Sequence, residues 1–165
     1  MRLKKNYSSR EVAALTGLTA RQLQWWAAHG IFAATIGTKP TAAGGFTERR
    51  YSLVEVLELQ VLADLRRRSF TAQNIRLLLD TLRTRFGIRL YDAIEGGALR
   101  LFTDGRDVFA RTEAGQLFSL VRFPGQPQLM LGEDELRELR ARPRHRRRKA
   151  PSPRGAKKRG DAAAS

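Results

Sequence analysis

The sequence predicts an α+β fold, with a head of four helices followed by a small antiparallel β meander and a disordered basic tail. Apolar residues recur at the helical period in residues 6–86, which we expect to form the first domain. Short strand-like runs separated by turn signals follow in residues 98–140, which we expect to form a small β-rich domain. Residues 141–165 contain almost no apolar residue except alanine, so a disordered tail is expected there.

The chain opens with two short helices joined by a tight turn. Ser8 with Glu11, and Thr19 with Gln22, have the spacing of capping boxes. In such a box a hydroxyl accepts from a backbone N–H of the first helical turn, and the side chain three residues later accepts from the N–H of the capping residue. Gly17 suits the end of the first helix because glycine accepts a positive φ. The pattern predicts a helix-turn-helix.

The second helix, over about residues 20–28, divides its side chains between two faces. Leu23 and Trp26 lie on the inner face, and the helical period places three polar or amphipathic side chains outward, those of Arg21, Gln24 and Trp25. An arginine can pair with guanine, a glutamine with adenine, and an indole N–H with a phosphate oxygen. The outer face is therefore suited to the major groove. The alternative is a small helical hairpin whose polar residues are simply solvated.

The order of motifs after this helix adds a second indication of DNA binding. A loop rich in glycine, with one proline, leads into an arginine pair before Tyr51. This order resembles the winged helix-turn-helix of the MerR family of bacterial transcription regulators. The resemblance covers about residues 6–80 and rests on Ser9-Arg10-Glu11-Val12-Ala13, Thr16-Gly17-Leu18-Thr19, Leu23-Gln24-Trp25-Trp26, Gly30-Ile31 and Arg49-Arg50-Tyr51-Ser52.

The resemblance implies that the second helix enters the major groove of double-stranded DNA and that the loop forms a wing along the phosphates. The expected DNA-binding residues are Thr19, Arg21, Gln22, Gln24, Trp25, Lys39, Arg49, Arg50 and Tyr51. Family members usually have Arg-Tyr-Tyr after the leucine of the second helix, where this chain has Gln24-Trp25-Trp26, so Arg21 becomes the candidate for base contact. For Arg49 and Arg50 the alternative is an ordinary solvated loop.

Two further helices are expected, one over residues 53–68 and one from a Thr71 cap to about Phe86, ended by Gly87. The arginines at 66, 67 and 68 suit either the C-terminal charge of a helix or phosphate contact. Ser69 stands where the family usually has glycine. The long helix through which well-known MerR regulators dimerise is not found after Gly87. A homodimer stays open because symmetric half-sites favour two copies.

The β segment is expected to contain strands over residues 99–103, 106–111, 116–123 and 128–131. Asp104-Gly105 has the signature of a two-residue hairpin turn. A short final helix is expected over residues 133–140. A sheet of three or four strands with one apolar face is not stable alone, so it should pack on the helices or on a second subunit.

The charge of the chain favours a polyanionic partner. The formal net charge is +15, and residues 141–165 contain ten Lys or Arg and one Asp. Nucleic acid is the natural polyanion, and a basic arm of this kind adds phosphate affinity without sequence preference. No apolar run is long enough to span a bilayer and the basic N-terminus lacks a secretory pattern, so no membrane partner is expected. The expected location is the cytoplasm, in association with the nucleoid.

The composition argues against catalysis and metal binding. The absence of cysteine excludes disulfides, thiolate metal sites and cysteine nucleophiles, and there are only two histidines. Asp104, Asp107 and Glu113 lie in or beside predicted turns, where acidic residues are common. We therefore expect no catalytic residues, no metal and no cofactor, and no enzymatic activity.

Three functions are compatible with these features. The first is a sequence-specific DNA-binding transcriptional regulator. The second is an accessory DNA-binding protein, either an excisionase-like architectural factor or the antitoxin of a toxin pair, whose β domain binds a protein. The third is a general nucleic-acid binder in which the basic tail dominates. RNA polymerase or another protein is the expected partner if the β domain serves as a docking surface.

Overall fold

The computed structural model describes residues 6–40, 47–129 and 135–141 of the chain. Its helical elements are α1 (Ser9–Thr16), α2 (Ala20–Ala28), α3 (Leu53–Arg67), α4 (Ala72–Thr81), the π-helix η1 (Leu82–Phe86) and α5 (Leu90–Ile94). Its strands are β1 (Tyr7–Ser8), β2 (Ile36–Pro40), β3 (Thr47–Tyr51), β4 (Arg100–Thr103), β5 (Val108–Arg111), β6 (Leu117–Ser119), β7 (Pro127–Gln128) and β8 (Arg137–Leu139). The α+β class is confirmed. Among the described helices, none has the length and apolar character needed to cross a membrane.

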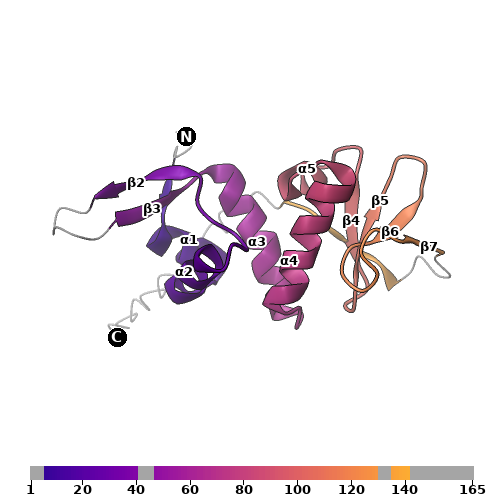
Figure 1. Ribbon diagram of the computed structural model, residues 1–165, viewed down its shortest axis with the longest axis horizontal. Coiled ribbons are helices and arrows are strands. Elements are labelled where there is room, and N and C mark those ends of the chain that lie inside the picture. Colours follow the sequence, from indigo (N-terminus) through magenta and orange to yellow (C-terminus); the bar gives the residue numbers. More distant parts are fainter. Residues whose placement is uncertain (1–5, 41–46, 130–134, 142–165) are drawn as a thin grey trace, which may run out of the picture.

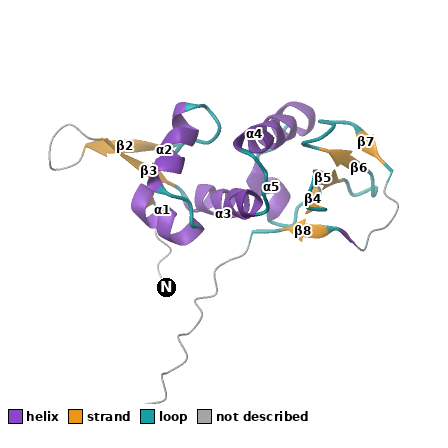
Figure 2. Ribbon diagram, turned by 90° about the horizontal axis from the view of Figure 1, so that it is seen from below, coloured by secondary structure: helices purple, strands orange, loops and turns teal. Residues whose placement is uncertain are grey.

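The molecule is elongated, with two sheets at opposite ends and helices between them (Figure 1). A three-stranded sheet of order β1-β3-β2 lies beside α1 and α2 at one end, and the β2–β3 hairpin projects from it. A five-stranded antiparallel sheet of order β7-β6-β5-β4-β8 lies at the other end (Figure 2). The helices α3, α4 and α5 connect the two, so the hairpin and the larger sheet are held far apart.

The helix starts of the head follow the predicted caps. Ser8 and Thr19 each accept from the N–H three residues later, at 3.2 and 3.0 Å, and both capping boxes are complete. Gly17 ends α1 with φ 80°, and its N–H donates to the carbonyl of Ala13 at 2.9 Å. Thr71 caps α4 as expected. These local predictions from sequence spacing are confirmed.

One hydrophobic core joins the helices to the larger sheet. Leu59, Leu62 and Leu65 of α3 are fully buried at its centre. The same cluster contains Leu101 and Val108 from the sheet, together with residues from every helix between α1 and α5. The expectation that the sheet packs on the helices is therefore confirmed. The sheet has five strands, however, rather than three or four.

The last strand corrects the prediction of a final helix over residues 133–140. Residues 137–139 form β8, which pairs antiparallel with β4, with Leu101 opposite Leu139 and Phe102 opposite Glu138. Leu139 is buried against the core, and Arg100 donates two hydrogen bonds of 2.7 Å to Glu138 across the pair. Residues 137–139 alone are compatible with a helix, but pairing with the edge of β4 makes them a strand. The part of the predicted helix before residue 135, and the predicted strand beyond residue 129, lie outside the described residues.

The hairpin turn at Asp104-Gly105 is longer than predicted. Thr103 pairs with Val108, so the connection contains four residues rather than two. The Asp104 carboxylate accepts from the N–H groups of Arg106 and Asp107, both at 2.8 Å, and these bonds fold the wider loop. The predicted strand over residues 106–111 is shortened to residues 108–111 for this reason.

Candidate nucleic-acid interface

The second helix presents the outer face that its sequence predicts. Leu23 and Trp26 are buried in the core, each with 2% of its surface exposed. Arg21, Gln24 and Trp25 are exposed. Trp25 keeps 44% of its surface exposed and stacks on the His29 ring, with 3.9 Å between ring centroids. A guanidinium, an amide and an indole therefore share one accessible surface at the head end of the molecule.

The turn between α1 and α2 is fixed by side-chain bonds. Thr16 donates through its hydroxyl to the carbonyl of Val12 at 2.7 Å and accepts from the N–H of Leu18 at 3.2 Å. The guanidinium of Arg67, in the last turn of α3, donates to the carbonyl of Thr16 at 3.3 Å. These bonds anchor the turn to the end of the central helix, so the outer face of α2 has a defined direction.

Thr19 and Gln22 stabilise the start of α2. Thr19 accepts from the N–H of Gln22, and Gln22 accepts through its Oε1 from the N–H of Thr19 at 2.9 Å. Thr19 is exposed and Gln22 is partly exposed. The structure therefore places both residues beside Arg21 in the first turn of α2, with their oxygen atoms used in the cap.

The hairpin carries the other predicted DNA-contact residues. Arg49 and Arg50 lie on β3 and are partly exposed. Lys39 lies on β2 opposite Glu48, but its side chain falls outside the described part of the structure. The backbone therefore brings Lys39 and the two arginines onto one antiparallel hairpin, while the tip between β2 and β3 lies outside the described residues.

Tyr51 differs from the other predicted contact residues because its side chain is fully buried. It pairs with Tyr7 of β1 and belongs to the hydrophobic core. Burial raises the pKa of the Tyr51 phenol, against the opposing effect of the nearby Arg49 charge. Its position in the core supports the end of the hairpin, and a buried side chain cannot reach DNA without local unfolding. Tyr51 is therefore not one of the proposed DNA contacts.

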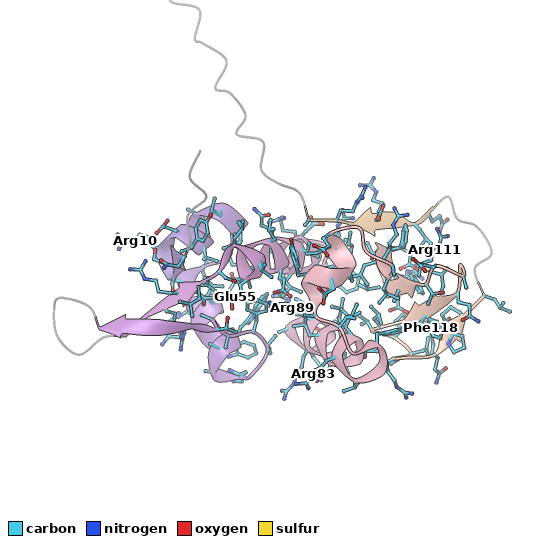
Figure 3. All side chains as sticks on the ribbon, turned by 90° about the horizontal axis from the view of Figure 1, so that it is seen from above. Arg10, Glu55, Arg83, Arg89, Arg111 and Phe118 are labelled. Carbon is cyan, nitrogen blue, oxygen red and sulfur yellow. The ribbon has the colours of Figure 1, made fainter. Side chains whose placement is uncertain are left out.

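Two further residues of this region were not selected from the sequence. Arg10 is exposed on α1 at the same end of the molecule as the hairpin (Figure 3). Glu55 of α3 is buried and bonds to both ends of the hairpin. The spacing of Ser52 and Glu55 is that of a third capping box and could have marked Glu55, whereas its bond to Thr35 has no local signature.

The described residues contain no group of three or more His, Asp or Glu side chains arranged to hold a metal ion. Glu55 and Glu58, the buried acids of α3, are both engaged in hydrogen bonds with protein groups.

A helix pair joined by a tight turn, whose second helix exposes Arg, Gln and Trp beside a β hairpin, has the arrangement of a helix-turn-helix domain. Residues 7–82 match the model of the MerR HTH family regulatory proteins. Similar curated proteins come from Mycobacterium bovis and two strains of Mycobacterium tuberculosis, each named as an uncharacterized HTH-type transcriptional regulator. Each is 29% identical over 116 residues, which is 70% of this chain and 48% of the relative. The chain thus spans about half the length of the curated relatives it matches.

Proposed function

We propose that this chain is a sequence-specific DNA-binding transcriptional regulator with a winged helix-turn-helix. In the proposal α2 enters the major groove and the β2–β3 hairpin acts as the wing. Arg21, Gln24 and Trp25 meet base edges and nearby phosphates, and Thr19 and Gln22 hold the first turn of α2 against the DNA. The wing residues Lys39, Arg49 and Arg50 contact phosphates of the DNA backbone.

The observation that carries this proposal is the outer face of α2, because it exposes an arginine and a glutamine, two side-chain types that can pair with base edges. The family match of residues 7–82 supports the same reading, as do the names of the mycobacterial relatives. These names favour a regulator over an excisionase-like factor or an antitoxin. Such a regulator would work in the cytoplasm on the nucleoid.

The proposal assigns different tasks to three parts of the chain. Residues 6–86 bind DNA, residues 98–140 form a small β-rich domain, and the basic residues 141–165 add phosphate affinity without sequence preference. The larger sheet lies at the far end from the hairpin, so it remains accessible to a protein such as RNA polymerase or to a second copy of the chain (Figure 2).

The proposal is tested by binding to duplex DNA across a salt series. The full chain and a version ending at residue 140 are measured against DNA from the gene's own promoter and against random duplex. We expect both versions to prefer one site by at least ~10³, near the lower end for specific readers. The shorter version should show a weaker salt dependence, by roughly 0.9 in log–log slope for each phosphate lost. Binding without preference that disappears with the tail would contradict the proposal.

A further inference from the structure

A buried carboxylate lies where the hairpin joins the central helix. Glu55, in the first turn of α3, has 1% of its surface exposed. Its Oε1 accepts hydrogen bonds from the N–H of Thr35, at 2.9 Å, and from the Thr35 hydroxyl. Its Oε2 accepts from the N–H of Ser52, also at 2.9 Å. Both carboxylate oxygens are therefore used, one by Ser52 three residues earlier and the other by Thr35 20 residues earlier.

The two partners of Glu55 mark the two ends of the hairpin. Thr35 immediately precedes β2, and Ser52 immediately follows β3. Ile36 pairs with Arg50 at the base, so the two strands are already adjacent there. One side chain thus bonds to the residue entering the hairpin and to the residue leaving it. Figure 3 shows Glu55 near this base, from which the hairpin extends away from the body of the molecule.

A capping role alone does not explain this arrangement. The cap of α3 requires only the bond from the Ser52 N–H, together with the bond of 3.2 Å from the Glu55 N–H to the Ser52 hydroxyl. Asn74 completes the corresponding box of α4 at an exposed position through a local bond. Glu55 adds a partner 20 residues earlier in the chain, and it does so from a buried position.

The central helix is a rigid support for this bond. Val56 and Leu59 follow Glu55 on α3 and are buried to 2% and 0% exposure. The first strand of the hairpin, by contrast, follows a connection that leaves α2 at His29. The contacts of Glu55 therefore tie the entry of the hairpin to the same helix whose far end anchors the turn before α2.

We propose that Glu55 is a positioning residue for DNA contact, which sets the direction of the hairpin relative to α2. With both ends of the hairpin held, Arg49 and Arg50 meet the phosphates beside the groove that α2 enters. The inference rests on the proposed function and deepens it. We call the bonds of Glu55 to Thr35 and Ser52 the clamp. Loss of the clamp should remove the contacts of the hairpin with DNA phosphates, while base reading by α2 stays intact.

The test uses the full chain with Glu55→Gln and Thr35→Val. Glutamine keeps one acceptor oxygen but presents an NH₂ group to the other partner, so one end of the hairpin is released. Valine removes only the hydroxyl donor of Thr35, an exposed residue, and this variant guards against a loss of folding. Glu58→Gln is the matched control, because Glu58 is buried one helical turn further along α3 and bonds to α5 instead.

Hydrogen exchange tests the clamp without DNA. The amides of Thr35 and Ser52 should exchange faster in Glu55→Gln than in the wild type, whereas Glu58→Gln should leave them unchanged. DNA binding then tests the positioning role. We expect Glu55→Gln to lower the salt slope by about 1 to 2, at roughly 0.9 for each phosphate, with the preference for the specific site retained. Thr35→Val should change the slope in the same direction by less.

The outcomes separate the two proposals. A wild-type chain that shows no site preference defeats the proposed function, and the positioning role falls with it. A wild type with a clear preference, combined with an unchanged slope in Glu55→Gln, overturns the positioning role alone. Equal loss of slope in Glu58→Gln would also overturn it, because the effect would then follow general loosening of α3 rather than release of the hairpin.

Discussion

The helical head and the larger sheet satisfy their buried and terminal polar groups in different ways. In the head, the starts of α1, α2, α3 and α4 are each capped by a side chain only three residues away. In the sheet, the buried carboxylate of Asp107 accepts from the N–H groups of Val108, Val121 and Arg122 and from the Ser119 hydroxyl. The helix starts of the head are thus held by local bonds, whereas in the sheet the side chain of Asp107 joins segments that lie apart in the sequence.

The largest expected effect is at Asp107. Replacement by alanine leaves up to three backbone N–H groups without their acceptor in a buried site, so the free energy of unfolding should fall by about 3 kcal/mol. Urea denaturation measures this loss. The matched control is Asp104→Ala, since Asp104 is exposed and bonds only within its own turn, and its loss should stay below about 1 kcal/mol. Equal losses at the two positions would contradict the account of the sheet.

At the junction between α3 and α5, replacement of Arg89 should lower the stability more than replacement of its partner Glu58. Glu58 is buried and accepts from the guanidinium of Arg89, whose side chain is 50% exposed, and from the N–H of Tyr91 at 3.2 Å. This hydrogen bond raises the pKa of the Arg89 guanidinium. Arg89→Ala leaves a buried carboxylate without its cation and should lower stability by about 2 kcal/mol. Glu58→Gln leaves an arginine that can turn to solvent, so a smaller loss is expected in the same denaturation experiment; the opposite order would contradict this account.

A local cap should matter less than either of these sites. Thr71 accepts from the N–H of Asn74 at 3.1 Å, and the position is exposed. Thr71→Ala should therefore cost about 1 kcal/mol, the usual value for loss of an N-cap. Thr71→Ser keeps the hydroxyl and serves as the control, with stability close to that of the wild type in thermal unfolding. A loss as large as that of Asp107→Ala would remove the contrast between the two regions.

The smallest expected effect is a gain in stability at Ser69. This residue connects α3 and α4 with φ 72°, a left-handed conformation that favours glycine. Ser69→Gly relieves the strain but increases the conformational freedom of the unfolded chain, so the net gain should be about 0.5 kcal/mol. The midpoint of urea unfolding should rise slightly, and Ser69→Ala, which keeps a Cβ, should show no such rise.

The same contrast explains what the sequence could predict. The starts of α1, α2 and α4 could be predicted from the sequence because a cap and its partner are three residues apart, as with Thr19 and Gln22. The strand β8 could not be predicted because residues 137–139 follow β4 by more than 30 positions, and the pairing decides their conformation. Ser69 is an intermediate case, since its place in the family pattern indicated a position usually held by glycine.

The residues of the candidate site also divide into those that local sequence spacing predicts and those that depend on the folded chain. Arg21, Gln24 and Trp25 were predicted from the helical period and are exposed as expected. Tyr51 was selected through the resemblance, which does not distinguish a side chain in the core from one on the surface. Glu55 was missed as a site residue because its bond to Thr35 depends on how the chain returns after the hairpin.

The central claim is that the outer face of α2 reads DNA sequence, and Arg21→Ala tests it most directly. The full chain and this variant are measured against promoter DNA and random duplex at one salt concentration. Arg83→Ala is the control, because the Arg83 side chain is 76% exposed, lies on η1 rather than on α2 and pairs with Asp80. We predict that Arg21→Ala brings the ratio of specific to random affinity close to one, from at least ~10³ in the wild type, while Arg83→Ala keeps it. An unchanged ratio in Arg21→Ala would show that α2 does not read the bases through this arginine, and it would contradict the central claim.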